Sequence, residues 1–182
     1  MEALLSDLPP EVSEAYERIL EKSKKERRTE TLLQIVLAAI RPLNLDEANV
    51  ALTLGLEKDR IHSHADLESY MWPKESFKDA VKNFCGLLIS VHESRLSFIH
   101  QTAREFLSHR ERRGNWQGRF CMTKSHGKMA SICLKYLSFL DEQEPVKEIR
   151  AKCPLAQYAA QYWMDHAKLA ETEKDVQDDV LK

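Results

Sequence analysis

Apolar residues recur at helical spacing over most of the chain, which predicts a mainly α-helical protein. Pro9 and Pro10 fit the first turn of a helix whose apolar stripe follows at residues 12, 16, 19 and 20. The same spacing predicts further helices at residues 29–40, 45–54, 73–85, 101–110, 126–140 and 155–169. Residues 57–70 are polar and show no clear period, so we expect a loop there.

Local signals mark the ends of several of these helices. Thr29 is placed to cap the second helix. Asn44 and Glu47 have the spacing of a capping box at the start of the third. Gly55 and Gly86 are predicted to end the third and fourth helices, because glycine adopts the left-handed backbone of a helix C-terminus without strain.

The period changes near the middle of the chain, where short apolar runs at residues 87–91 and 96–99 flank a turn-like segment. The sequence therefore predicts a mainly α fold that is α+β only through a single β-hairpin. Three helices followed by a hairpin are in the order of a winged helix, here flanked by additional helices. We expect a lead-in helix in residues 1–28, a winged-helix domain in 29–110 with its wing at about 87–99, and a C-terminal helical extension with an acidic tail in 111–182.

Composition narrows the class of protein. The chain of 182 residues has 27 basic and 29 acidic residues, a net charge of −2, so nothing attracts it globally to nucleic acid or an anionic membrane. It has no signal-peptide pattern and no apolar run near the roughly 20 residues of a membrane span, so we expect a cytoplasmic location. Its four cysteines lie far apart, without a C-x-x-C pair, which argues against a zinc knuckle or a disulfide scaffold.

Known catalytic motifs are missing. The chain has no phosphate-binding loop, dinucleotide-binding glycine motif, zinc-protease motif or serine-hydrolase elbow, so we expect no enzyme activity and no metal. His62 and His64 could approach a metal ion, but no further ligands lie near them in the sequence. Cys85 could be drawn as a nucleophile beside a histidine, but its position at the end of an apolar helix favours a buried, structural thiol.

Nucleic-acid binding is a second class to weigh, because winged helices often read DNA with their third helix. The basic residues of that helix are Lys74, Lys78 and Lys82, and they are offset by Glu75 and Asp79. The wing adds only Arg95, which is less than a phosphate-lined groove usually demands. We interpret the basic run at residues 24–28 as a solvated helix end.

One position stands out as a candidate site. His100 directly follows the second predicted strand and directly precedes the predicted helix at 101–110. The backbone N–H groups at a helix N-terminus suit an anion such as a phosphate, and an imidazole there can donate a hydrogen bond to it. The alternative is that His100 caps the helix or packs between wing and helix.

Three stretches carry a resemblance to a known family: residues 32–43 (LLQIVLAAIRPL), 85–88 (CGLL) and 98–107 (FIHQTAREFL). They are similar to the winged-helix region that follows the NACHT nucleotide-binding domain in fungal NOD-like (STAND) proteins, many of which continue into ankyrin repeats. The same region resembles the winged-helix domain named after GPI inositol-deacylase. Residues 8–20, 133–137 (CLKYL) and 154–163 (PLAQYAAQYW) resemble the flanking helices, so the resemblance covers nearly the whole chain.

The resemblance implies a non-enzymatic regulatory module that docks on a NACHT domain, in cis or in trans, and helps to hold its ADP-bound closed state. In related proteins the histidine of a Met-His-Asp motif contacts the β-phosphate of ADP, and His100 matches that histidine. Ile99 and Gln101 replace the methionine and the aspartate, and Gln101 keeps hydrogen-bonding capacity without the charge. ADP or ATP would enter only with a NACHT domain, because this chain has no phosphate loop.

Other functions stay open at this stage. The chain could be a free-standing interaction adaptor or decoy, a winged-helix nucleic-acid binder, or a hydrolase built around Cys85 or His100. We interpret it either as one module of a longer protein or as a short gene product that keeps only this region.

Overall fold

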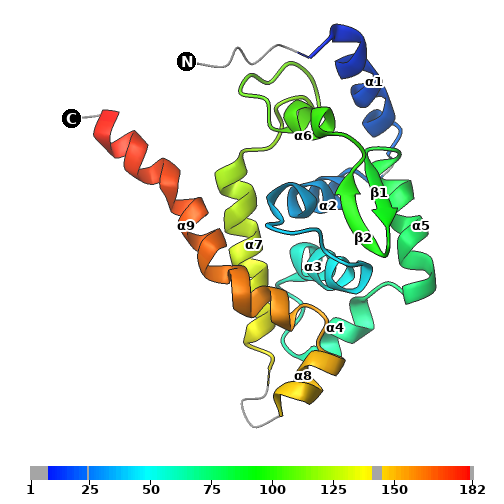
Figure 1. Ribbon diagram of the computed structural model, residues 1–182, viewed down its shortest axis with the longest axis vertical. Helices are drawn as coiled ribbons and strands as arrows, with labels where there is room; N and C mark the ends of the chain where they lie inside the picture. Colours follow the sequence, from blue (N-terminus) through cyan, green and yellow to red (C-terminus); the bar gives the residue numbers. More distant parts are fainter. Residues whose placement is uncertain (1–7, 24, 141–144, 181–182) are drawn as a thin grey trace.

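The computed structural model describes residues 8–23, 25–140 and 145–180 (Figure 1). Its elements are α1 (Pro10–Glu21), α2 (Glu26–Ala38), α3 (Leu45–Glu57), α4 (His64–Tyr70), α5 (Lys74–Cys85), β1 (Ile89–His92), β2 (Arg95–Phe98), α6 (Gln101–Leu107), α7 (Met122–Leu137), α8 (Val146–Lys152) and α9 (Ala156–Val180). The two strands form the single sheet of the described residues. The predicted fold class, mainly α with one hairpin in a winged-helix unit flanked by helices, is confirmed.

Helix α2 lies at the centre of the molecule, with α3, α5, α7 and the hairpin arranged around it (Figure 1). Most of its residues are buried, and these are Thr29, Thr31, Leu32, Leu33, Ile35, Val36, Leu37 and Ala38. A helix that is buried on most of its circumference needs apolar neighbours on several sides. The winged helix consists of α2, α3 and α5 as its first, second and third helices, followed by the hairpin. Helix α7, from the C-terminal part of the chain, covers a further side of α2.

The wing is a short antiparallel hairpin fixed to the start of α3. Its register pairs Ile89 with Phe98 and Val91 with Leu96. Glu93 and Ser94 both have positive φ, as a two-residue turn that follows the right-handed twist of the strands requires. The Ser94 carbonyl accepts from the N–H of Leu45 at 2.9 Å, and the Leu96 N–H donates to the Leu43 carbonyl at 2.8 Å. The strands lie inside the predicted range of 87–99.

Two predicted helix boundaries hold and two are wrong. Asn44 and Glu47 form the predicted capping box, and Gly86, at φ +56°, is the C-cap of α5. Gly55, however, lies inside α3, where an added Cβ would come within 2.8 Å of Thr31 Cγ2 on α2. This glycine therefore permits close helix packing and does not stop the helix. Thr29 is not a cap but a buried residue of α2, whose hydroxyl donates to the Phe84 carbonyl at 2.8 Å.

Two short helices were not predicted. The expected loop at 57–70 contains α4, which Ser63 caps and which buries only Leu67. Helix α8 lies in the segment between the two long C-terminal helices. Each has seven residues, so neither presents enough apolar positions for a helical period to show. The long helices α7 and α9 also extend beyond their predicted starts or ends.

A chain of buried polar groups joins α9 to α7 and to the end of α2. The Tyr158 hydroxyl accepts from the Ile40 N–H at 3.1 Å and lies 2.9 Å from His166 Nε2. His166 Nδ1 lies 2.9 Å from His126 Nδ1, so one of these two nitrogens donates to the other. Burial, and then the neighbouring His126, lowers the pKa of His166 to about 4. Burial, and then the charge of Arg104, also lowers the pKa of His126.

These two histidines predict a loss of stability in acid. The unfolded chain takes up a proton near the ordinary histidine pKa of 6.5, but folded His166 does so only near 4. Stability is therefore complete above pH 6.5 and falls as the pH drops towards 4, by about 1.4 kcal/mol per pH unit for each excess proton on the unfolded chain. Urea unfolding between pH 7.5 and 4 should show a steeper fall for the wild type than for His166→Gln. The exposed His62→Gln is the matched control; equal slopes for wild type and His166→Gln would contradict this assignment.

Candidate functional site

His100 lies where the chain leaves β2 and enters α6, as the sequence predicts. It is the N-cap of α6, and its Nδ1 accepts from the backbone N–H of Thr102 at 3.2 Å. A neutral imidazole that accepts at Nδ1 carries its proton on Nε2. His100 therefore caps the helix and, at the same time, has an Nε2–H donor on an exposed ring. His100 can therefore cap the helix through Nδ1 and still donate a hydrogen bond to a phosphate through Nε2.

The same cap connects the candidate site to the N-terminal helix. Thr102 Oγ1 lies 3.0 Å from His100 Nδ1 and 2.8 Å from the hydroxyl of Tyr16 on α1. The Tyr16 ring packs against Phe106 of α6 at a centroid distance of 5.4 Å. Glu17 directly follows Tyr16 in α1, and its Oε1 accepts from the N–H groups of Trp116 and Gln117, both at 2.9 Å. His100 and Tyr16 of α1 therefore contact the same threonine of α6.

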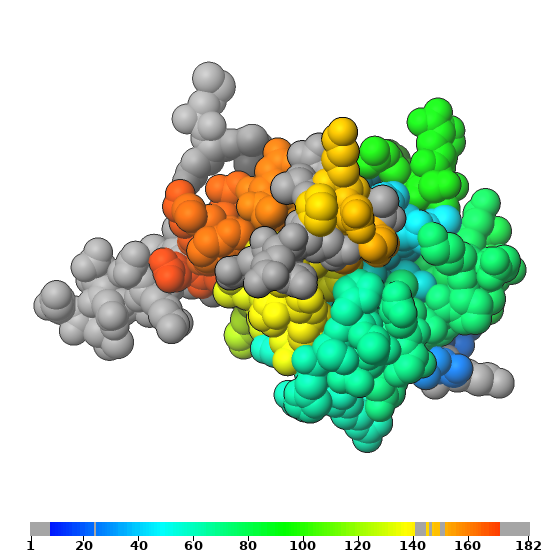
Figure 2. Space-filling model, turned by 90° about the horizontal axis from the view of Figure 1, so that it is seen from below, coloured from blue at the N-terminus to red at the C-terminus, as the bar shows by residue number. Residues whose placement is uncertain are grey.

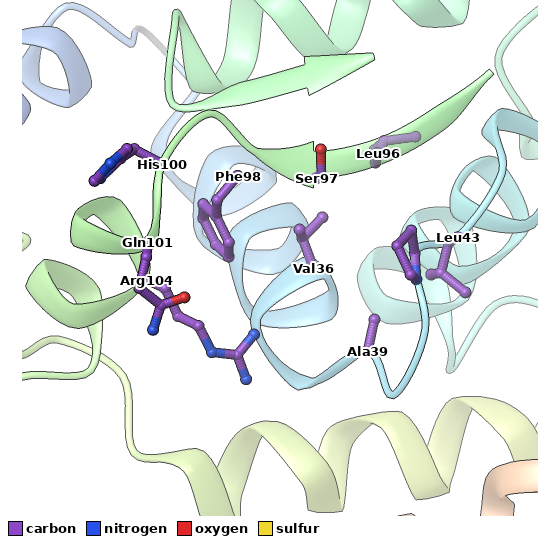
Figure 3. Close-up of a pocket in the computed structure, with 10 residues that line it drawn as sticks. Val36, Ala39, Leu43, Leu96, Ser97, Phe98, His100, Gln101 and Arg104 are labelled. Atoms are coloured by element: carbon purple, nitrogen blue, oxygen red, sulfur yellow. The ribbon is translucent and has the colours of Figure 1, made fainter. Parts of the chain in front are cut away.

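A groove of about 240 Å³ opens beside His100, between the end of α2, strand β2 and the start of α6 (Figure 3). Its apolar lining comes from Val36, Ala39, Pro42, Leu43, Leu96 and Phe98, with Ser97, His100, Gln101 and Arg104 as polar neighbours. Figure 3 shows Gln101 and Arg104 reaching towards the space below Phe98, while the ring of His100 is turned outward at the rim. Ile99 is 56% exposed beside it. Groove and rim together offer an apolar surface, one cation and two neutral hydrogen-bonding groups.

Helix α6 is shorter than predicted and ends at Leu107. The Ser108 hydroxyl donates to the Arg104 carbonyl at 2.9 Å, which satisfies one of the last carbonyls of the helix. A helix of seven residues contributes only a small dipole at its N-terminus. The attraction for an anion predicted from the helix end is therefore weak, and the relevant donors are His100 Nε2, Gln101 and Arg104. Arg104, which lies within the stretch 98–107 that resembles the family but has no role assigned from the sequence, makes no ion pair with the rest of the described chain.

The other candidate residues do not join this site. Cys85 is fully buried, and burial raises the pKa of its thiol well above the ordinary value, which disfavours the nucleophilic thiolate. His62 is exposed, and its backbone N–H donates to Asp66. His64 belongs to α4 at another part of the molecule. Within the described ranges, no three His, Cys, Asp or Glu side chains are grouped to hold a metal ion.

Several of the basic residues around the predicted DNA-binding helix have partners within the chain. Lys74 pairs with Asp46 at 3.1 Å, and the guanidinium of Arg95 donates to the Pro42 carbonyl at 3.1 Å. Within the run at 24–28, Lys24 lies outside the described residues. Arg27 donates to the Leu56 carbonyl, and Arg28 stacks 5.4 Å from the centre of the Trp72 ring. Lys25 and Arg27 are exposed, as the interpretation of this run as a solvated helix end predicts, whereas Arg28 is half-buried against Trp72.

The cap predicts a specific order of stability among His100 variants. His100→Ala removes the acceptor for the Thr102 N–H and should lower the free energy of unfolding by about 1 kcal/mol. His100→Asn should retain most of that stability, because asparagine is a good N-cap acceptor. Urea unfolding of the three proteins measures the difference. Equal stability of the alanine and asparagine variants would show that the cap does not stabilise α6.

Comparison with known proteins agrees with this geometry. The family model of the GPI inositol-deacylase winged helix domain matches residues 16–117, which run from α1 to the loop that Glu17 holds. Neither the curated proteins nor the solved structures give a match. No helix in the described part of the chain is both long and apolar enough to cross a membrane. With more than half of its residues matched, the chain belongs to the GPI inositol-deacylase winged helix domain family.

Proposed function

We propose that this chain is a non-enzymatic regulatory module that docks on a NACHT nucleotide-binding domain in the cytoplasm and stabilises its ADP-bound closed state. Membership of the winged-helix family supports a regulatory or interaction module in general. The NACHT partner, the nucleotide and the link to ankyrin-repeat proteins of the fungal STAND class rest on the resemblance of residues 32–43, 85–88 and 98–107.

The observation that carries this proposal is which ring nitrogen His100 exposes. Its Nδ1 is occupied by the Thr102 N–H, so the exposed Nε2–H is a donor with a fixed orientation. Such a donor suits a phosphate oxygen supplied by a nucleotide in a partner domain. Arg104 and Gln101 stand along the same groove and would add a charge and a hydrogen bond at the interface.

The apolar part of the surface supports docking of a protein on the same side. Pro42 is exposed and Phe98 is half-buried in the groove lining, and Ile99 is exposed at its rim. A mixed surface of this kind is typical of an interface that opens and closes, because its apolar area is modest and its polar groups are not yet paired. ADP would bias the two states by contacting both domains in the closed one only.

The proposal is tested by mixing the chain with a NACHT domain whose own winged helix, of this same family, has been removed. Gel filtration should show co-elution that is stronger with ADP than without nucleotide. His100→Asn keeps the cap but lacks the Nε2–H, so it should weaken the ADP-dependent part of the affinity by roughly tenfold, the value of a charge-assisted hydrogen bond.

Lys78→Ala is the matched control, because Lys78 is exposed on α5, outside the groove. If the chain binds the NACHT domain with an affinity that depends neither on ADP nor on His100, its function is that of an interaction adaptor. Absence of any association, with salt-dependent binding to DNA that Lys78→Ala reduces, would favour a nucleic-acid binder instead.

A further inference from the structure

A second group of reactive side chains lies at the opposite end of the molecule from His100. Cys153 sits between α8 and α9, and its Sγ is 3.7 Å from Nε2 of His64 at the start of α4. The other ring nitrogen of His64 lies 3.6 Å from Oε1 of Glu68, one turn further along α4. A thiol, an imidazole and a carboxylate therefore stand in line, although 89 residues separate the first two in the sequence.

The cluster borders a cleft of about 720 Å³. His64, Glu68, Tyr136 and Pro154 line this cleft, so small molecules can reach the imidazole from solvent. Cys153 itself is 7% exposed, directly behind these residues. Figure 2 looks onto this end of the molecule, where the gold of α8 adjoins the orange of α9 above the blue-green of α4 and its neighbours. Access is thus restricted to reagents little larger than water.

Tyr136 is a second and independent sign of a ligand at this place. Its side chain is completely buried, and its hydroxyl lies beside Cys153 and the backbone of Leu155 without a hydrogen bond of ordinary geometry to the described residues. Burial raises the pKa of Tyr136, and the adjacent Cys153 raises it further. A buried hydroxyl without a partner is costly, and an oxygen atom added to Cys153 Sγ would give it an acceptor.

We propose that Cys153 is a peroxide-sensitive thiol that hydrogen peroxide converts to a sulfenic acid, with His64 as the base and Tyr136 as the donor that stabilises the product. Nε2 of His64 takes the thiol proton, and the sulfur electron pair attacks one peroxide oxygen. The O–O bond breaks, the leaving hydroxide takes the proton back from His64, and water departs. Sulfur is oxidised by two electrons, and the peroxide is reduced by the same two.

The other cysteines are poorer targets. Cys85 and Cys133 are buried, and burial raises the pKa of the Cys133 thiol to about 12. Cys121 is half-exposed at the start of α7 and is the natural competitor. Because thiolate character controls thiol oxidation, the base beside Cys153 should outweigh the greater exposure of Cys121.

The test is limited oxidation of the folded full chain with hydrogen peroxide, which is then removed with catalase. The chain is unfolded in guanidinium chloride that contains dimedone, so that this larger reagent reaches every sulfenic acid, and the labelled cysteines are identified by peptide mass spectrometry. Label should appear on Cys153 before it appears on Cys121. His64→Gln keeps the size of the side chain without the base and should slow labelling of Cys153 by about tenfold or more. Tyr136→Phe, which removes only the unpartnered hydroxyl, should shorten the lifetime of the sulfenic acid and increase the sulfinic product.

His62→Gln is the matched control, since His62 is exposed two residues from His64 and should leave the rate unchanged. Circular dichroism of each variant verifies that it folds. Labelling of Cys121 ahead of Cys153 would overturn the proposal. An unchanged or faster rate in folded His64→Gln would overturn it equally, because it would show that the thiol reacts by exposure alone.

Discussion

The burial of α2 is the constraint on which the rest of the structure depends. Its apolar residues, among them Leu32, Leu33 and Ile35, have no exposed surface and point in several directions. Helices α3 and α5 and the wing cover part of α2, and α7 covers another part. The C-terminal helix α7 therefore belongs to the same core as the winged helix, and one hydrophobic cluster extends from Leu20 to Ala159.

The candidate site follows from how this central helix ends. After Ala38 the chain turns through Pro42 to the capping box of α3, and the Arg41 guanidinium holds Glu47 through two hydrogen bonds of 2.7 and 2.8 Å. Glu47 also accepts from the Asn44 N–H, so the turn and the helix start are fixed together. The wing pairs with this turn, and the groove beside His100 is the space left between the turn, the wing and α6.

Two kinds of element differ in how well the sequence predicts them. The hairpin, the capping box and the C-cap at Gly86 rest on interactions between residues within about ten positions, and all are found where expected. Helices α4 and α8 have only seven residues each, too few to show a clear helical period, and Gly55 makes a contact with α2 that lies outside its own helix. Local sequence patterns do not predict the role of a residue that is required by its contact with another helix or strand.

The sequence by itself determined the mainly helical class, the place of the wing and the position of His100 between strand and helix. Only the tertiary structure decided which His100 nitrogen is exposed, that Arg104 lines a groove, and that Cys153 meets His64. The same holds for the pairing of His126 with His166 across two helices. The physical reason is that hydrophobic periodicity records which face of each helix is buried. It does not record which faces meet, and these sites form only where elements distant in the sequence pack together.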